Sequence, residues 1–229
     1  MYYLRVKYIL LVVSILASTL IAFAQKDALK KLSTDYENSF KKNKTFHLPY
    51  TLIIASSLDT TVEKVQVDLY KTEHADYLKM GTMQEVIHDG ALLLIVNHEM
   101  KMIRIGEDSS NMASNHLLVS NFSSIIDSSK SITSETKDGI IHYVITFSPT
   151  YVYSTLELDF SKKTKNLHKI HAAFSTAKPS EFKYLEVDYK DPDFKWIPES
   201  SFPNTDKYVA KSTSGNYVVK DAYDSYKVF

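Results

Sequence analysis

Cysteine is absent from the sequence, which has 229 residues. Its absence excludes disulfide bonds, thiolate metal sites and cysteine nucleophiles. It also excludes a lipid-modified N-terminal cysteine, so we expect a mature chain that is soluble and carries no lipid anchor. A secreted protein of this size without disulfides is typical of a bacterial periplasm rather than of an animal extracellular fluid, where disulfides are common.

The sequence also lacks an excess of charge of one sign, because 27 Lys and Arg residues balance 27 Asp and Glu residues. A nucleic-acid partner would call for a basic excess, so we predict none. Familiar catalytic motifs are missing as well: there is no Gly-x-Ser-x-Gly elbow, Walker loop, dinucleotide fingerprint or His-Glu-x-x-His helix. We therefore predict no cofactor, no catalytic residues and a protein that is not an enzyme.

Long hydrophobic runs are confined to the start of the chain. Arg5 and Lys7 precede an apolar stretch, and Ala22 and Ala24 match the A-x-A pattern that signal peptidase accepts. We predict that residues 1–24 are a cleaved secretory signal; an uncleaved anchor is the alternative. A periplasmic location follows from this reading.

The mature chain, 25–229, has about 205 residues, within the range of one large all-β domain. There is no internal repeat and no low-complexity linker. We predict a single domain in which residues 206–229 form a C-terminal extension.

The first mature segment, 26–44, has helical periodicity. Leu29, Leu32, Tyr36 and Phe40 recur at helical spacing among lysines. The pattern predicts one amphipathic helix that packs on a sheet.

Short segments with a period of two follow this helix. They include "FHLPYTLIIA", "VEKVQVDLYK", "DYLKMG", "MQEVIH", "ALLLIV" and "MKMIRI", and later "GIIHYVITF", "YVYSTLELDF", "LHKIHAAFS" and "EFKYLEVDYK". Turn residues such as Asp89-Gly90 separate them, and such short connections force antiparallel neighbours. We predict a mainly β fold with flanking helices, in which one antiparallel sheet of about ten strands is strongly curved or half closed.

Residues 107–136 interrupt the strand pattern and are rich in serine. Met112, His116, Val119 and Phe122 have the spacing of short helices. Loops of this length inside a compact domain are usually functional or disordered. We expect one or two short helices here with an apolar underside, resembling a lid.

The sequence has eight histidines, which raises the question of a metal site or an acid–base pair. His168 and His171 lie three apart in a predicted strand, where they face opposite ways. His88-Asp89 precedes Gly90, and this Asp-Gly pair is typical of a tight hairpin that needs positive φ. We predict solvated turn residues and no metal site. Two interpretations of the apolar strand faces remain open: they form an ordinary core, or they line a cavity for an apolar ligand.

The order of these elements resembles the periplasmic outer-membrane lipoprotein carrier (LolA-type) superfamily over roughly residues 26–205. In that family an Asp-Gly hairpin introduces a strand of the form "DGk-lw-Y", followed by a return strand. The matching positions here are Asp89, Gly90, Leu93 and Leu94, with Lys101 and Ile103 in the return strand. The later "LELDF…KI…F" resembles the strand pair that closes the family's half-barrel.

The resemblance implies an unclosed antiparallel β-barrel with an N-terminal helix and a helical lid segment over an apolar cavity. The expected cargo is the acyl chains of a lipoprotein or another acylated lipid, carried from an inner-membrane donor complex towards an outer-membrane acceptor by a monomer. Strand alternation then assigns the cavity residues, although a register error of one residue inverts a strand's face. The predicted cavity residues are Leu52, Ile54, Val67, Leu69, Leu78, Met80, Leu92 and Leu94, and the predicted lid residues are Leu117, Leu118 and Phe122.

One feature of the family is missing. Typical carriers have an Arg-Pro pair after the "DLW-K" strand, and the arginine helps to hold the lid shut. Here Glu73-His74 occupies that region, and Arg104 is the only mature arginine. The family's gating mechanism is therefore not transferred to this chain. The tail after residue 205 also extends beyond the family pattern, and we expect it to add strands or to dock on the barrel edge.

Two other functions are compatible with these residues. The first is a periplasmic lipoprotein-sensing or protein-interaction module with the same fold. The second is a hydrolase acting on an envelope lipid through His88 or His98, which the hairpin reading of these histidines disfavours.

Overall fold

The structure is a computed structural model. The predicted signal segment lies outside its described residues, apart from Ala24. No helix among the described residues is long and apolar enough to cross a membrane. The residues described are 24–58, 61–90, 92–107, 122–177, 180–195, 197–198, 200, 203–213 and 215–229.

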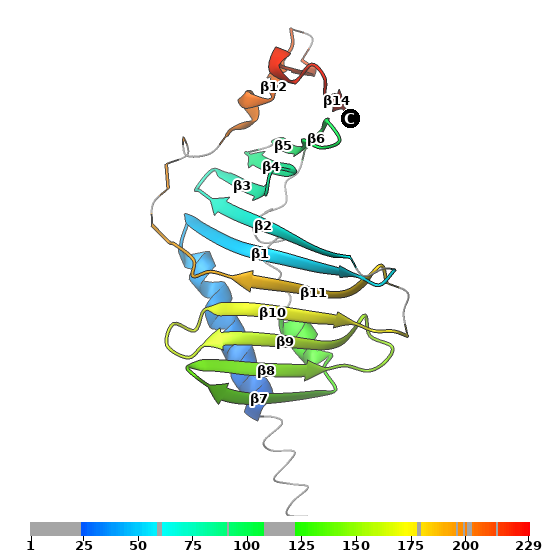
Figure 1. The fold of residues 1–229 in the computed structure, drawn as a ribbon. Helices are drawn as coiled ribbons and strands as arrows, with labels where there is room; N and C mark the ends of the chain where they lie inside the picture. The colour runs from blue at the N-terminus through cyan, green and yellow to red at the C-terminus, as the bar shows by residue number, and fades with distance from the viewer. Residues whose placement is uncertain are drawn as a thin grey trace, which may run out of the picture. The chain divides into compact units, whose positions relative to one another are not determined.

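The chain divides into two compact units. Unit 1 consists of Met1–Asn38, Ala55–Thr61 and Asn121–Glu186, and unit 2 consists of Ser39–Ile54, Val62–Ser120 and Val187–Phe229. Strands β1 (Phe46–Ser56) and β11 (Phe182–Tyr189) contribute residues to both units (Figure 1).

The N-terminal helix spans residues 24–42 of the described chain. The four apolar residues predicted to form its stripe, Leu29, Leu32, Tyr36 and Phe40, are all buried. In unit 1 the ring of Tyr36 meets that of Phe160 edge to face at 6.4 Å. The helix therefore packs its stripe on the sheet, as the periodicity predicted.

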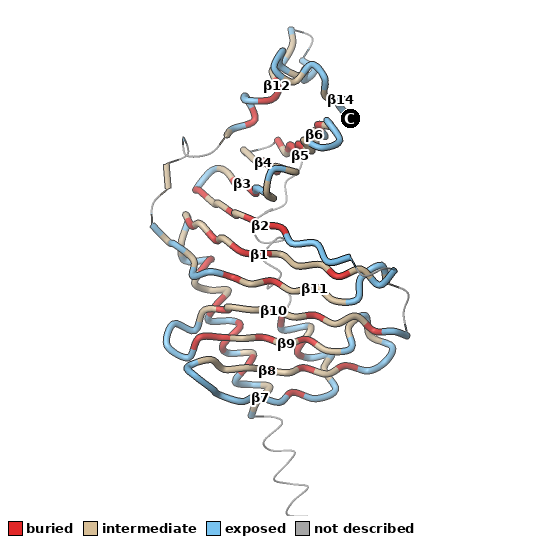
Figure 2. The backbone as a smooth tube through the Cα atoms, in the orientation of Figure 1, coloured by how far each residue is buried: buried red, intermediate tan, exposed pale blue. Residues whose placement is uncertain are grey.

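Unit 1 is an antiparallel sheet with two helical segments. Its strand order is β11-β10-β9-β8-β7. Leu156 and Leu158 on β9 face Ile145 and Tyr143 on β8, so one side of the sheet is apolar. Figure 2 shows buried positions alternating with more exposed ones along these strands. The elements are α3 (Phe122–Asp127), β7 (Ser131–Lys137), β8 (Ile140–Thr146), β9 (Tyr153–Ser161) and β10 (Leu167–Phe174).

The helical prediction for residues 107–136 was wrong in its last part, because Ser131–Lys137 form strand β7. Ile132 lies opposite Ile145 of β8 and is buried, whereas the other β7 side chains are exposed. One inward β-branched residue and a neighbouring strand are enough to order an edge strand, and its abundant serines hid this pattern. Residues 108–121, which include Leu117 and Leu118, lie outside the described residues.

Unit 2 contains the predicted meander. Consecutive strands pair antiparallel from β2 to β6, and β1 follows β2 in the sheet order. Gly90 has φ of 69°, as the Asp89-Gly90 turn requires. The meander strands are β2 (Val62–Lys71), β3 (Ala75–Met80), β4 (Gln84–Asp89), β5 (Leu92–Asn97) and β6 (Met102–Glu107).

The C-terminal extension belongs to unit 2 and confirms the expectation of added strands. β12 and β13 form an antiparallel hairpin, and β14 pairs parallel with β6. Its elements are η2 (Thr205–Lys207), β12 (Val209–Lys211), β13 (Tyr217–Val219), η3 (Asp221–Tyr223) and β14 (Lys227–Val228). The described chain is thus mostly β, with an open linear strand order, an N-terminal helix and a second short helix, which confirms the predicted fold class.

Candidate functional site

The predicted cavity residues of β2 and β3 lie together on one face of the meander. Val67 is opposite Met80, and Leu69 is opposite Leu78. Directly opposed residues of an antiparallel pair point to the same side of a sheet. Leu78 is opposite Val86 on β4, which extends the apolar surface by one strand. We call this surface of unit 2 the Leu69 face.

Leu52 and Ile54 of β1 point to the same side. The side-chain amide of Gln66 donates a hydrogen bond of 2.9 Å to the hydroxyl of Thr51, so these two residues share the opposite side. Since side chains alternate along a strand, Leu52 and Ile54 point to the Leu69 face.

The Leu69 face is buried in its middle and half-buried at its margins. Val67, Leu69 and Leu78 are buried, whereas Leu52, Ile54 and Met80 are only partly covered. Two further apolar residues, Leu93 and Ile95 of β5, point to this side and are also half-buried. Sequence reasoning missed them because every residue from Leu92 to Val96 is apolar, so alternation could not choose a face.

The structure separates the other two predicted cavity residues from this surface. Leu94 is opposite Ile87 on β4, and Ile87 is opposite Tyr77 on β3. Leu92 shares this side and packs with Leu94 in a core cluster that includes Tyr208 of the extension. We call this surface the Leu94 face; it is covered by the C-terminal extension.

A polar group lies at one end of the Leu69 face. Asp76 is opposite Lys71 and His88, and its carboxylate is buried. Lys71 Nζ is 3.1 Å from Asp76 Oδ1, and His88 Nδ1 is 3.9 Å from Asp76 Oδ2. His88 thus shares its face with Asp76, whereas Asp89, the next residue along the strand, points to the other side. His88 and Asp89 are neighbours in the sequence, but their side chains lie on opposite sides of the sheet.

The predicted lid residue Phe122 is the first residue of α3 in unit 1, and it is buried together with Ile126. Asp127 ends this short helix and lies 2.6 Å from Lys30 Nζ and 3.4 Å from Lys26 Nζ. The hydrogen bond from Lys30 is the main cause that lowers the pKa of Asp127. Ion pairs therefore link α3 to the N-terminal helix.

Glu85 joins the C-terminal extension to the Leu94 face. Tyr208 Oη donates a 2.6 Å hydrogen bond to Glu85 Oε2, and His98 Nε2 lies 3.2 Å from Glu85 Oε1. Lys207 Nζ lies 3.8 Å from the same carboxylate. Burial by itself raises the pKa of Glu85, but the bond from Tyr208, the charge of Lys207 and bonds from His98 and Tyr77 lower it below its ordinary value. Burial and Glu85 together raise the pKa of Tyr208.

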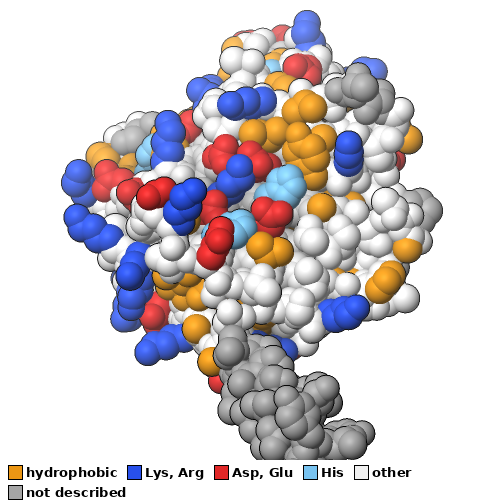
Figure 3. Space-filling model, turned by 60° about the horizontal axis from the view of Figure 1, so that its bottom comes forward, with side chains coloured by type: hydrophobic (Ala, Val, Ile, Leu, Met, Phe, Trp, Pro, Cys, Tyr) orange, Lys and Arg blue, Asp and Glu red, His pale blue; other side chains and the backbone are white. Residues whose placement is uncertain are grey.

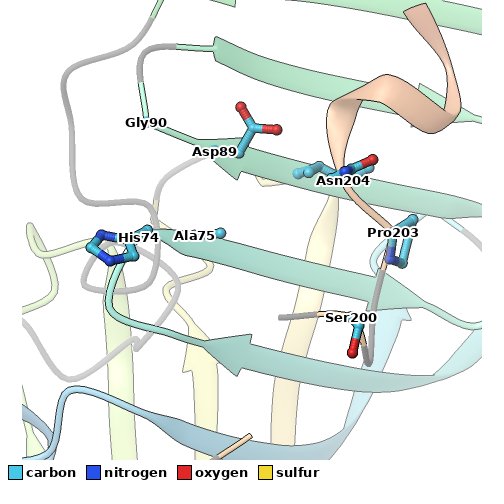
Figure 4. Close-up of a pocket in the computed structure, with 8 residues that line it drawn as sticks. His74, Ala75, Asp89, Gly90, Ser200, Pro203 and Asn204 are labelled. Carbon is cyan, nitrogen blue, oxygen red and sulfur yellow. The ribbon is translucent and has the colours of Figure 1, made fainter. Parts of the chain in front are cut away.

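A hollow of about 690 Å³ lies where the turns at the ends of β2 and β4 meet the chain that leads into η2 (Figure 4). Its lining includes His74, Ile87 and Asn204. Asp89 Oδ2 accepts hydrogen bonds from Thr205 N at 3.1 Å and Thr205 Oγ1 at 2.5 Å. No predicted cavity residue lines this hollow.

Two further histidines pair with carboxylates on polar strand faces. In unit 1, His142 Nδ1 is 2.6 Å from Asp159, and His171 Nδ1 is 3.2 Å from Glu186. Figure 3 shows acidic, lysine and histidine side chains gathered on the face that it views. Over the described ranges, no group of three or more His, Asp or Glu residues is placed to hold a metal ion.

No protein-family model matches the sequence, and no curated protein matches it. The fold is similar to that of several solved structures. One is a LolA superfamily protein from Nitrosomonas europaea, with 11% identity, a TM-score of 0.37 and coverage of 76% of this chain and 97% of that chain. Another is the lipoprotein LppX from Mycobacterium tuberculosis, with 10% identity, a TM-score of 0.42 and coverage of 72% and 94%.

A third similar structure is the MucA/MucB complex of Pseudomonas aeruginosa, with 9% identity and a TM-score of 0.42. The match covers 78% of this chain and 60% of that chain.

Proposed function

We propose that this protein is a periplasmic carrier that binds the acyl chains of a lipoprotein or another lipid and transfers them towards the outer membrane. The proposed binding surface is the Leu69 face: Leu52, Ile54, Val67, Leu69, Leu78 and Met80, extended by Leu93 and Ile95. Phe122, with Leu117 and Leu118, is proposed as part of the lid. We also propose that an inner-membrane donor complex supplies the cargo and that an outer-membrane acceptor receives it.

The observation that supports this proposal most directly is the half-burial of apolar side chains on the Leu69 face. A fully buried core residue is in contact with neighbours on all sides. Here Leu69 and Leu78 are buried, whereas Met80 and Ile95, on the same side, are partly open. A surface that keeps apolar side chains partly uncovered suits a ligand that is bound and released.

The polar end of the Leu69 face fits an amphiphilic ligand. An acyl chain can lie along the apolar side chains while Lys71, Asp76 and His88 meet the polar linkage at its end. Burial of about fourteen methylenes at roughly 0.8 kcal/mol each gives a gross gain of about 11 kcal/mol. Ordering of the chain reduces this gain, and the remaining affinity suits a carrier that must also release its cargo.

The test is native mass spectrometry, with solvent extraction, of the chain from Gln25 to Phe229 purified from a bacterial periplasm without detergent. We expect a co-purified acylated ligand. A ligand-free mass, together with no uptake of a fluorescent fatty acid, would contradict the proposal.

Two neighbouring residues of β1 provide a matched pair of variants. Leu52 and Ile53 are both half-buried, but they point to opposite sides of the sheet. Leu52→Asp should abolish ligand retention, whereas Ile53→Asp should keep it, with circular dichroism confirming that both variants are folded. Equal loss in both variants would count against binding on the Leu69 face.

A further inference from the structure

A continuous row of aromatic rings lies at one end of the sheet in unit 1. Phe147 stacks on Tyr151 with ring centroids 4.6 Å apart, and Tyr151 lies 6.1 Å from Tyr153. Tyr153 is 5.4 Å from Phe174, which in turn is 5.9 Å from Phe182. The row therefore crosses from the β8–β9 connection to the start of β11.

Backbone and side-chain hydrogen bonds bring three connections together at this end. Ser175 N donates to the carbonyl of Val152 at 2.9 Å, and its hydroxyl donates to the carbonyl of Pro149 at 3.0 Å. Ser57 N donates to the carbonyl of Glu181 at 2.9 Å, which places the end of β1 beside the β10–β11 connection. We call the resulting surface of unit 1 the aromatic rim; its residues are Leu58, Phe147, Tyr151, Val152, Tyr153, Phe174 and Phe182.

The aromatic rim exposes large apolar side chains to solvent. Leu58 is 81% exposed, Val152 is 42% exposed and Phe182 is 40% exposed. Single exposed apolar residues are common, but several in one place usually mark an interaction surface. Phe182 is itself the last ring of the aromatic row, which joins it to Phe174 and Tyr153.

The aromatic rim carries almost no charge, although charged residues make up 24% of the sequence. Segments 56–58, 147–152 and 174–177 contain no Asp, Glu, Lys or Arg. The charged residues that flank these segments in the sequence are Asp59, Lys178, Glu181 and Lys183, two of each sign. A surface without net charge is complementary to a headgroup layer that is itself neutral overall, and it offers little to a partner recognised by charge.

We propose that the aromatic rim docks on the surface of a lipid bilayer. Tyrosine rings sit favourably at the level of lipid headgroups, because the ring is apolar and its hydroxyl reaches water. Leu58, Val152 and Phe182 insert into the outer part of the bilayer, and Tyr151 and Tyr153 lie in the headgroup layer. The protein thus meets the membrane directly, through unit 1 and without a charged motif.

This docking goes beyond the proposed carrier function and can be separated from it. The Leu69 face belongs to unit 2, so Leu52→Asp should lose the acylated ligand and still bind vesicles. Vesicle binding by a protein that never retains an acylated ligand would contradict the carrier function alone.

The experiment is flotation of the chain from Gln25 to Phe229 with protein-free vesicles. One set contains phosphatidylcholine only, and the other contains phosphatidylethanolamine with phosphatidylglycerol. We expect both sets to bind the protein, with little change on adding salt. Leu58→Ser and Phe182→Ser should each lower the ratio of bound to free protein roughly tenfold.

Two valines of similar exposure supply the control. Val152 is 42% exposed on the aromatic rim, and Val218 is 48% exposed on β13 in unit 2. Val152→Ser should weaken flotation, whereas Val218→Ser should leave it unchanged, with circular dichroism confirming that both are folded. Equal weakening by the two variants overturns the proposal. It is also overturned if neither vesicle set binds the protein, or if only native membranes with their proteins do, since the partner is then a protein.

Discussion

Tyr208 of the C-terminal extension donates a hydrogen bond of 2.6 Å to Glu85 of strand β4, across 123 residues of sequence. The side chain of Glu85 is 12% exposed, and Tyr208 is fully buried against Leu94 and Ile87. This contact joins the extension to the meander, and it means that the Leu94 face is part of a packed core.

Loss of this hydrogen bond should destabilise unit 2. Tyr208→Phe keeps the ring but removes the donor to a largely buried carboxylate, and such bonds to charged groups contribute about 1.5–3 kcal/mol. We expect a decrease of that size in the free energy of unfolding in urea. Tyr217→Phe, on the exposed side of β13, should change it little; an equal decrease would contradict the role given to Glu85.

The lowered pKa of Glu85 predicts how stability depends on acid. Its contribution is present above the ordinary carboxyl pKa of 4.5 and is lost as the pH falls through the lower folded pKa. Glu85→Gln should therefore be less stable than the wild type at neutral pH, and the difference should shrink below about pH 4.5. Urea unfolding over a pH series measures this, with Glu99→Gln at an exposed turn as the control.

Leu94 and its neighbour Leu93 test which side of β5 is the core. Leu94 is completely buried on the Leu94 face, whereas Leu93 is half-buried on the Leu69 face. Leu94→Ala should cost about 2–5 kcal/mol, because it leaves a cavity that the surroundings fill only in part. Leu93→Ala should cost less and should weaken retention of the acylated ligand. If only Leu94→Ala loses the ligand, the binding surface is the Leu94 face and its assignment to the Leu69 face is wrong.

Tyr50 should ionise late in the folded protein. Burial raises its pKa from 10.0 to about 12. Because its neutral form is favoured in the folded state, its contribution to stability is complete below pH 10 and is lost as the pH rises towards 12. The absorbance of tyrosinate, measured over a pH series, should show one late-ionising tyrosine fewer in Tyr50→Phe than in the wild type. If the curve changes only near pH 10, the raised pKa is wrong.

The ion pair between Lys30 and Asp127 should hold α3 in place. Asp127→Asn removes the charge that faces Lys30 and Lys26, so we expect faster amide hydrogen exchange at Ile126 and Ser128. Asp35→Asn is a suitable control, because Asp35 lies on the N-terminal helix and pairs with Lys165 instead. Unchanged exchange in Asp127→Asn would mean that packing of Phe122 and Ile126 alone anchors the helix.

Much of the fold was predictable from local pattern. The helical stripe of Leu29, Leu32, Tyr36 and Phe40 and the alternation in "VEKVQVDLYK" each follow from a single periodicity. Gly90 marked its hairpin because an Asp-Gly pair supplies the positive φ that the turn needs. Strand β7 escaped prediction because only Ile132 signals its buried side.

The proposed binding face was predictable only in part. Val67 and Leu69 alternate with polar residues, so their sequence alone selects a side of β2. "LLLIV" offers apolar side chains to both sides, and the choice between Leu93 and Leu94 depends on the register with β4 and on Tyr208, which is distant in sequence. Sequence periodicity therefore determined the strands of the meander and their turns. The tertiary structure alone decided which apolar surface the extension covers and which it leaves uncovered, because that depends on contacts between residues more than 100 positions apart.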